Sequence, residues 1–477
     1  MKGNPADYII IIAYLVGVAA FGIWSGGKQK SVKDYFLGAK TVKWWAVCFS
    51  IVAAETSTLT FISIPGLAYL TNLNFLQVTF GYLLGRVVVA FLFLPAYAKG
   101  DLKTAYSFLE NRFGAKTRTF ASIVFLFTRT AADGVRLFAT AIPLKLMLGI
   151  EYPPAILIIA LVSLIYTYTG GLKGIIWVDV IQMFVYLGGA IIASIYLLNI
   201  LPEGWMASVS PDKFQIFNLG FTGGVGEFFS QPYTLIGGII GGMFLSMASH
   251  GTDQLIVQRL LATPDLKSSQ KAIIGSGIVV VIQFAIFLIL GVMLYAYYGI
   301  IDIRSDEIFP KFIIEVLPPG FTGLIIAGLF AAAMSTLAGS MSSLSSSTMI
   351  DIYIPFFGKD MNDEKQLRIS RIFTLMWAGL LIVSAILFME SPQAVVELAL
   401  SIASFTYGGL LGTFLLGLLN KKATQEDALA GFTAGIFVMI SVITLNLAAW
   451  TWFTLIGVTA TLLIGSLLSA LSQRERI

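Results

Sequence analysis

The stretch Ala53-Ala54-Glu55-Thr56-Ser57-Thr58-Leu59-Thr60, followed by Ile64-Pro65-Gly66, lies within an apolar segment that covers residues 44–70. Small and hydroxyl-bearing residues surround a single acid there, and a Pro-Gly pair comes shortly afterwards. This pattern is typical of an interrupted membrane helix whose freed carbonyl groups bind a cation. It also suits a close helix contact in which Ser and Thr hydroxyls bond to the backbone.

Similar apolar segments recur along the whole chain of 477 residues, which is 57% hydrophobic and only 12% charged. A membrane helix needs about 20 apolar residues. We therefore expect an all-α membrane protein, a single domain over residues 1–477, with about 13 transmembrane helices. The expected spans are 8–25, 44–70, 74–98, 118–148, 153–169, 174–200, 234–258, 272–298, 320–350, 370–389, 394–419, 428–447 and 450–472.

The composition also excludes several classes of function. A soluble enzyme would carry about twice this share of charged residues. One histidine and one cysteine exclude most metal and nucleophile arrangements, and Cys48 alone forms no internal disulfide. No nucleotide-binding motif is visible, so we expect transport that is not driven by ATP. We expect no nucleic acid partner and no obligate protein partner, only the lipid bilayer, an ion and a solute.

Basic residues alternate between the loops and predict the orientation. One set of loops carries 22 of the 30 Lys and Arg residues, and by the positive-inside rule it faces the cytoplasm. This predicts a multi-pass inner-membrane protein with the N-terminus outside and the C-terminus inside. The 22 are Lys28, Lys30, Lys33, Lys40, Lys43, Lys99, Lys103, Arg112, Lys116, Arg118, Lys173, Arg259, Lys267, Lys271, Lys359, Lys365, Arg368, Arg371, Lys421, Lys422, Arg474 and Arg476.

A second concentration of hydroxyl groups lies in the segment 320–350, which contains Ser335 and Thr336. Without the first span and the last two, ten helices remain, or two sets of five, at about 44–200 and 234–419. The two hydroxyl-rich helices are then the first and eighth of the ten. These are corresponding places in transporters whose ion bridges a broken helix and a helix of the other half. Hydroxyl and carbonyl oxygens suit sodium, a hard cation.

Asp179 follows the cytoplasmic turn at Gly170-Gly171 and lies one to two turns inside the next helix. An acid at this depth is a candidate coupling site for a cation or a proton. A salt bridge to a neighbouring helix is the structural alternative.

Six motifs, in order, resemble the sodium:solute symporter family of sodium/glucose, sodium/proline and bacterial sialic acid transporters, and the resemblance covers nearly the whole chain. They are Asp34-Tyr35-Phe36-Leu37-Gly38; Trp44-Trp45-Ala46; Gly170 to Gln182, with Trp177 and Asp179; Thr252-Asp253-Gln254 with Val257-Gln258-Arg259; Ala332 with Ser335-Thr336 and Asp351-Ile352-Tyr353; and Gly408-Gly409 with Gly412, Phe414 and Gly417.

The resemblance implies a LeuT-like fold, a 5+5 inverted repeat with one extra N-terminal and two extra C-terminal helices. It implies sodium symport and a sodium site made by the backbone oxygens of Ala53, Thr56 and Ala332 and the hydroxyls of Ser335 and Thr336. Some members add a second sodium at the aspartate that matches Asp179, with serines on the eighth core helix. Ala338 and Gly339 stand at those serine positions, so we expect one sodium per cycle.

The solute positions that the resemblance implies are Glu55, Ser57, Thr60, Phe75 and Thr79. The carboxylate-binding arginine of the sialic acid transporter falls on Ala132. Arg129 and Arg136 lie on nearly the same helix face and are its candidate replacements, although Arg136 also suits an ion pair with Asp133.

We therefore expect sodium-coupled uptake of a small polar organic solute, a sugar or sugar acid. A proton-coupled symporter that uses Glu55 or Asp179 and a sodium-coupled amino acid or carboxylate transporter are the alternatives. His250, the only histidine, suits either a solute contact or a hydrogen-bonded position at a helix interface.

Overall fold

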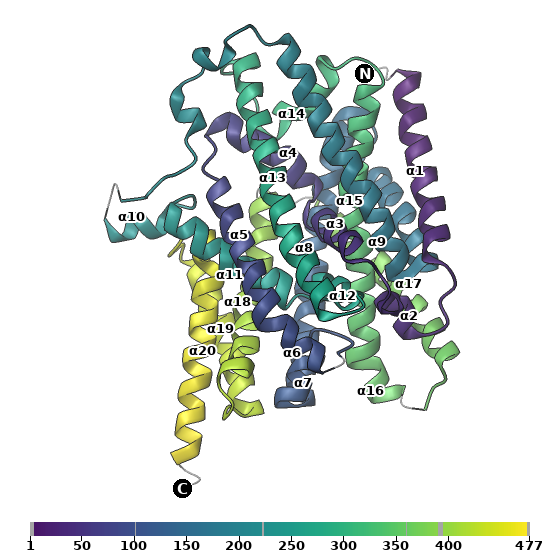
Figure 1. The fold of residues 1–477 in the computed structure, drawn as a ribbon, viewed down its shortest axis with the longest axis vertical. Coiled ribbons are helices and arrows are strands. Elements are labelled where there is room, and N and C mark those ends of the chain that lie inside the picture. The colour runs from purple at the N-terminus through teal and green to yellow at the C-terminus, as the bar shows by residue number, and fades with distance from the viewer. Residues whose placement is uncertain (1–3, 101, 222–223, 359, 390–394, 475–477) are drawn as a thin grey trace.

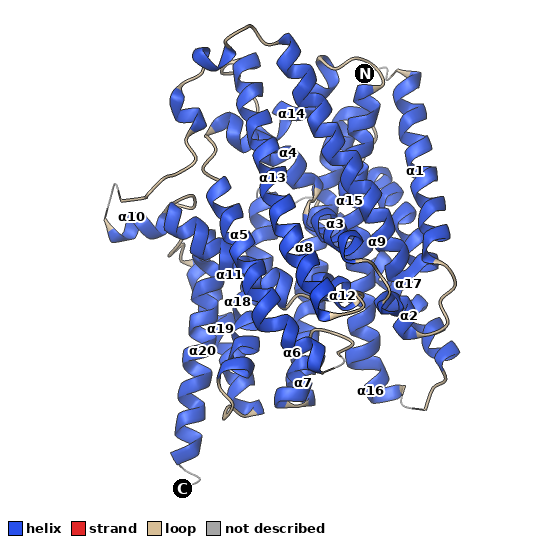
Figure 2. Cartoon of the chain, viewed as in Figure 1, coloured by secondary structure: helices blue, strands red, loops and turns tan. Residues whose placement is uncertain are grey.

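The computed structural model is an elongated bundle in which most helices run along the long axis, with the two chain ends at opposite ends of the bundle (Figure 1). It describes residues 4–100, 102–221, 224–358, 360–389 and 395–474, and these contain helices and loops but no strand (Figure 2). The all-α class expected from the sequence is thus confirmed for the described residues.

The helices are, in chain order, α1 (Pro5–Gly26), α2 (Val32–Leu37), η1 (Gly38–Lys40), α3 (Trp44–Glu55), α4 (Thr58–Leu70), α5 (Leu76–Val88), η2 (Val89–Phe93), α6 (Leu94–Lys99), α7 (Ser107–Phe113), α8 (Ala115–Leu148), α9 (Tyr152–Ile200), η3 (Trp205–Ser208), η4 (Pro211–Phe214), α10 (Val225–Ser230), η5 (Gly237–Gly241), α11 (Gly242–Gly251), α12 (Gln254–Leu261), α13 (Leu266–Tyr298), α14 (Ser305–Glu315), α15 (Phe321–Ser347), η6 (Thr348–Tyr353), α16 (Ile354–Phe357), α17 (Asp363–Leu387), α18 (Val395–Leu419), α19 (Gln425–Thr444) and α20 (Trp450–Arg474).

Eight of the described helices are long and apolar enough to cross a membrane, or nine if the bent pair Val32–Lys40 and Trp44–Glu55 forms one span. These helices do not correspond one to one to the thirteen expected spans. The 49-residue α9 covers two of them, and the expected span 44–70 is divided between α3 and α4. The number of spans therefore stays a prediction.

Two helices on the expected spans are interrupted where the sequence indicates. The first interruption lies at Thr56 and Ser57, between α3 and α4, within the stretch of small and hydroxyl residues. Pro65 lies inside α4 and does not break it. The second lies in α9 at Gly171, whose φ of 56° and ψ of −163° depart from helical values. A Cβ atom at Gly171 would lie 2.8 Å from the carbonyl oxygen of Tyr35, so both the angle and the space require glycine.

Helix α1 is attached to the bundle at both of its ends. Near its start, Oδ1 of Asp7 accepts hydrogen bonds from the backbone N–H groups of Gly320 (2.7 Å) and Gly323 (2.8 Å) at the beginning of α15. Near its end, a Cβ at Gly26 would lie 2.2 Å from the Cα of Gly170, so the two backbones are in direct contact. Small residues permit this close approach between membrane helices.

Helix α15 occupies the centre of the bundle. Nearly all of its residues are buried, including every one of its serines, and it packs against α1, α8, α9 and α17. The outer faces of other helices carry exposed apolar side chains such as Trp24 and Phe127, as expected for surfaces in contact with lipid.

Candidate ion and solute site

The break between α3 and α4 releases backbone carbonyl groups beside α15. The carbonyl of Val52 accepts the last helical hydrogen bond of α3, from the N–H of Thr56 (3.0 Å), so the carbonyls that follow are free of the helix. On α15, Oγ1 of Thr336 donates toward the carbonyls of Ala54 (3.4 Å) and Ala332 (3.2 Å). Oxygen atoms of the first and eighth core helices therefore meet at one place.

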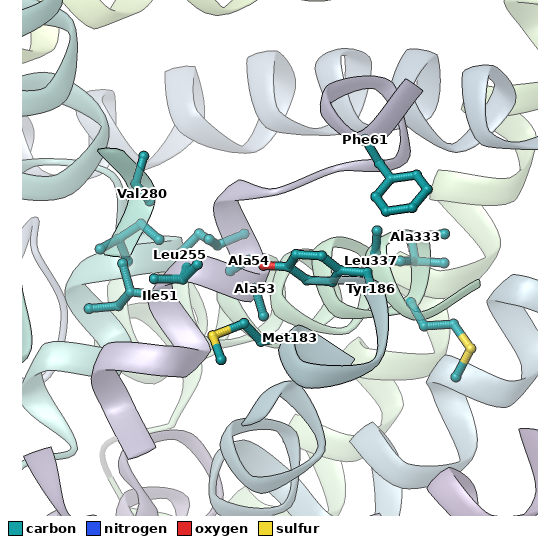
Figure 3. Close-up of a cluster of buried hydrophobic side chains, with 14 of the residues drawn as sticks. Ile51, Ala53, Ala54, Phe61, Met183, Tyr186, Leu255, Val280, Ala333 and Leu337 are labelled. Atoms are coloured by element: carbon teal, nitrogen blue, oxygen red, sulfur yellow. The ribbon is translucent and has the colours of Figure 1, made fainter. Parts of the chain in front are cut away.

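The surroundings of this break are apolar and closely packed. Ala53 and Ala54 at the end of α3 belong to the same buried cluster as Met183 and Tyr186 of α9 and Leu337 of α15 (Figure 3). The low polarity around a few oxygens strengthens their attraction for a cation.

Ser335, the residue before Thr336 on α15, lies beside a buried ion pair. Its hydroxyl donates to Oδ1 of Asp179 at 2.7 Å. Oδ2 of Asp179 accepts from Nη2 of Arg259 (3.0 Å) and from the hydroxyl of Ser50 (2.5 Å). The side chains of Asp179 and Arg259 are fully buried. In this structure Asp179 therefore forms a salt bridge to a neighbouring helix, which is the structural alternative given for it in the sequence analysis.

Gly339 makes the position of Arg259 possible. A Cβ atom at this residue would lie 2.7 Å from Nη2 and 3.0 Å from Nη1 of Arg259. The guanidinium therefore lies directly against the α15 backbone, on the side of Asp179 where related transporters are expected to carry serine. The sequence predicts a loop position for Arg259 and gives no sign of its pair with Asp179, whereas the structure places it in α12, fully buried.

Thr56, at the break, takes part in a chain of side-chain hydrogen bonds. Its hydroxyl accepts from Nε2 of Gln283 on α13 (2.6 Å), and the Oε1 of Gln283 accepts from the hydroxyl of Tyr186 (3.1 Å). The chain connects the break to both α9 and α13. The neighbouring Ser57 caps α4 by accepting from the N–H of Thr60 (3.4 Å).

Glu55 forms an ion pair that the sequence did not indicate. Its Oε2 accepts from Nη2 of Arg86 on α5, and Nε2 of His250 on α11 lies 3.5 Å from the same oxygen. Nδ1 of His250 bonds to the hydroxyl of Ser249 (2.7 Å). His250 is thus buried between helices, and its Nε2 has no hydrogen-bond partner among the described residues.

The two candidate arginines of α8 differ in their surroundings. Arg129 is bonded to Asp133 through Nε and to Asp253 through Nη1 (3.1 Å), and its side chain is only 8% exposed. Arg136 makes the expected i,i+3 pair with Asp133, at 3.3 Å, and is 26% exposed. Arg136 therefore keeps donors free for a further partner, whereas Arg129 is held by two carboxylates.

Two small cavities meet at Arg136. One is lined by Ser57, Asp133, Leu137, Thr140 and Thr336 in addition to Arg136. The other is lined by Arg129, Arg136, Ala132, Asp253 and Tyr407, among others. Arg136, Ser57 and Thr336 are thus brought together at the break.

Phe75 and Thr79 are not among the residues that line these two cavities. The ring of Phe75 stacks on Phe284 with a centroid separation of 5.3 Å. Thr79 is buried and donates to the carbonyl of Leu76 (2.8 Å). Tyr407, which the sequence analysis did not single out, donates to Oδ2 of Asp253 at 2.9 Å from α18.

Relatives of the chain are transporters. It is 29% identical over 476 residues to the sodium/sialic acid symporter NanT of Aliivibrio fischeri, covering 97% of this chain and 92% of the relative. It is 27% identical over 463 residues to the sodium/glucose cotransporter of Vibrio parahaemolyticus, covering 90% and 83%.

Solved structures give the same result for the fold. The structure of a Na+-coupled sialic acid symporter in a substrate-bound outward-open state matches with a TM-score of 0.90 and 27% identity over 98% of both chains. A nucleobase-cation-symport-1 family transporter in a closed conformation matches with a TM-score of 0.58 at 14% identity, over 90% of this chain and 92% of that one, and shares the fold alone.

The profile of the sodium:solute symporter family matches residues 35–435, which is most of the chain. The resemblance of the six motifs, the all-helical architecture and this match agree. The protein belongs to the sodium:solute symporter family, a family of sodium-coupled membrane transporters.

Proposed function

We propose that this protein is a secondary active transporter that takes up a small polar organic solute together with sodium by alternating access. The observation that carries the proposal is the meeting of Thr336 with the carbonyl of Ala54 at the helix break, since it unites oxygens of two helices from different halves of the chain. An ion bound there orders both helices and completes the adjoining solute site. Each ligand then raises the affinity for the other by the same factor.

The proposed architecture has thirteen membrane spans, with inverted repeats at about 44–200 and 234–419. The N-terminus lies outside and the C-terminus lies in the cytoplasm, because the loops rich in Lys and Arg belong to the same side as the C-terminus. The chain ends at opposite ends of the bundle support an odd number of spans (Figure 1).

The proposed sodium site consists of the backbone oxygens of Ala53, Thr56 and Ala332 and the hydroxyl oxygens of Ser335 and Thr336. All five residues are buried, and oxygen is the ligand that hard cations prefer. One sodium is proposed per cycle. In support, the carboxylate of Asp179 is already paired with Arg259, and Gly339 supplies no side-chain oxygen.

The proposed solute carries a carboxylate, as a sugar acid does. Arg136 supports this assignment because its guanidinium borders both cavities and is bonded to a single carboxylate. A planar guanidinium binds a carboxylate through two parallel hydrogen bonds. Ser57 and Thr60 at the start of α4 supply hydroxyl groups near the break for the rest of the solute, and Glu55 supplies a partly exposed carboxylate.

The test is the thermal stability of the purified full chain across a panel of sialic acids, other sugar acids, neutral sugars, amino acids, monocarboxylates and vitamins, each with sodium and with potassium. A ligand that binds only the folded state raises the melting temperature. The expected result is a stabilising acid that requires sodium. A neutral sugar as the best ligand contradicts the role of Arg136. Equal stabilisation in potassium contradicts sodium coupling and favours proton coupling through Glu55 or Asp179.

A further inference from the structure

A buried carboxylate that forms no ion pair within the described part of the chain lies at the end of α15 that continues into η6. Asp351 is fully buried within this π-helical turn, a type of turn that is frequent at functional sites. Its Oδ1 accepts from the hydroxyl of Thr104 (2.6 Å), and its Oδ2 accepts from the hydroxyl of Ser347 (2.8 Å). Ser347 in turn lies 2.7 Å from the hydroxyl oxygen of Ser122 on α8. Hydroxyl groups from three separate segments thus form one hydrogen-bonded group with this carboxylate, with Ser122 joined to it through Ser347.

The charge of Asp351 is not balanced as the charges of three other acids in the bundle are. Asp133, Asp179 and Asp253 each contact an arginine. In the part of the chain that the structure describes, no Lys, Arg or His nitrogen forms an ion pair with Asp351. Arg118 lies near enough to interact electrostatically, but its guanidinium is bonded to Glu110. A carboxylate buried without a counter-charge is strongly disfavoured, so Asp351 requires a cation or a proton.

Two other polar atoms, one on the segment of Thr104 and one on the helix of Ser122, have no hydrogen-bond partner among the described residues. The hydroxyl of Tyr106 is fully buried, interacts electrostatically with Asp351, and makes no hydrogen bond among the described residues. The hydroxyl of Thr117, in the first turn of α8, is likewise buried and unpaired. Buried polar groups in folded proteins are almost always satisfied by protein, water or ions. This region therefore offers more polar atoms than its own hydrogen bonds use.

A line of hydroxyl groups connects this region with the proposed sodium site. Thr336, Ser340, Ser343, Ser347 and Asp351 follow one another at intervals of three or four residues. Residues at this spacing share one face of a helix. The hydroxyl of Ser340 bonds to Asp133, so a second carboxylate lies beside the line. The line is about 22 Å long at a rise of 1.5 Å per residue.

We propose that Asp351, Thr104, Ser122 and Ser347 form a second sodium site, at the cytoplasmic end of α15, which takes up the transported ion after it leaves the break between α3 and α4. The direction of the movement rests on the proposed function, whereas the ability of the site to hold a cation does not. Carboxylate and hydroxyl oxygens are the ligands that a hard monovalent cation prefers. The ion balances the charge of Asp351. When the ion departs to the cytoplasm, a proton or the next ion takes over that role, while the hydroxyls of Thr104 and Ser347 stay beside the carboxylate.

The experiment is equilibrium binding of radioactive sodium to the purified full-length protein at saturating sodium, in the wild type and in four variants. Asp351→Asn removes the charge, and Ser347→Ala removes one ligand with less risk to folding. Thr336→Ala removes a ligand of the proposed site at the break. Ser345→Ala is the matched control, because Ser345 is also buried on α15 and its hydroxyl bonds only to the carbonyl of Met341.

The expected result is two bound sodium ions in the wild type and in Ser345→Ala, and one in Asp351→Asn. Ser347→Ala is expected to weaken one of the two by about tenfold, a change of about 1.4 kcal/mol. Unchanged binding in both Asp351→Asn and Ser347→Ala overturns the proposal. The proposal is also overturned if the wild type binds a single sodium ion and Thr336→Ala abolishes that binding. Release of a proton on unfolding would then show that Asp351 is protonated in the folded protein.

The two proposals fail in different ways in this experiment. Full binding in Thr336→Ala together with a loss in Asp351→Asn contradicts the site at the break and retains the site at Asp351. A variant that elutes as an aggregate or has lost its cooperative melting transition is replaced by Thr104→Val, which removes a hydroxyl of the same site and is expected to weaken one of the two bound sodium ions. Thr104→Ser keeps the hydroxyl, is expected to bind two sodium ions, and is the control for that replacement. Potassium competition in the same assay shows whether the site prefers sodium. Displacement of both ions by equimolar potassium contradicts a sodium site.

Discussion

The hydroxyl of Ser335 donates to Oδ1 of Asp179 at 2.7 Å, so its proton points away from the helix break. The lone pairs of the same oxygen are consequently directed elsewhere, as is required of a cation ligand. Partners of this kind orient the groups that bind an ion. The pair of Asp179 with Arg259 in turn fixes the carboxylate that orients Ser335.

Loss of either hydroxyl on α15 is expected to weaken sodium binding. Loss of an outer partner at metal sites costs about 10–100-fold in affinity, and loss of a direct ligand is expected to cost at least as much. Ser335→Ala and Thr336→Ala should therefore raise the sodium concentration for half-maximal uptake while solute selectivity stays the same. Thr336→Ser retains the hydroxyl and is the control. If Ser335→Ala and Thr336→Ala need no more sodium for half-maximal uptake than the control Thr336→Ser, the assignment of these two ligands is wrong.

One sodium is expected to move with each solute molecule. Parallel fluxes of labelled sodium and labelled solute into proteoliposomes measure the ratio directly and do not depend on the charge of the solute. Gly339→Ser is expected to leave the ratio at one, because its side chain meets the guanidinium of Arg259 and not an open site. A flux ratio near two in the wild type contradicts the stoichiometry.

The two arginines of α8 are expected to respond differently to removal of charge. Arg136→Gln should abolish the rise in melting temperature that a carboxylate-bearing solute causes. The melting temperature of the solute-free protein should stay nearly unchanged, because the Arg136 side chain is partly exposed and bonded to a single carboxylate. Arg129→Gln leaves Asp133 and Asp253 without their shared partner, and loss of one member of a buried ion pair costs about 3–5 kcal/mol. Melting curves with and without solute separate the two effects. Arg136→Lys is the control for charge, and an undiminished solute response in Arg136→Gln would contradict its role.

The contact between α1 and α9 is expected to be intolerant of even one methyl group. Gly26→Ala places a carbon 2.2 Å from Gly170, whereas Gly17→Ala, on the same helix, meets nothing within 4 Å. Overpacking of this kind typically costs about 1–3 kcal/mol. Thermal melting should therefore be lowered by Gly26→Ala and not by Gly17→Ala. Equal melting temperatures for the two variants would show that α1 adjusts freely.

Sequence reasoning was successful where the information is local. The interruption near Thr56 is visible because small and hydroxyl residues replace large apolar ones there, and the pair of Arg136 with Asp133 follows from a spacing of three residues. The pairs Glu55 with Arg86 and Asp179 with Arg259 were missed because their partners lie on different helices. Helical periodicity gives the face of each residue but not the depth at which two helices meet.

The attachment of α1 at Asp7 and at Gly26 determines how this helix behaves when the transporter changes conformation. Asp7 attaches α1 to the start of α15, and Gly26 attaches it to α9, whereas the backbone of α5 is in contact with η5 and α11 at Gly81. We therefore expect the first helix to move together with the parts of α9 and α15 that it contacts. A spectroscopic label at the exposed Trp24 would report the motion of that body relative to a label on α5.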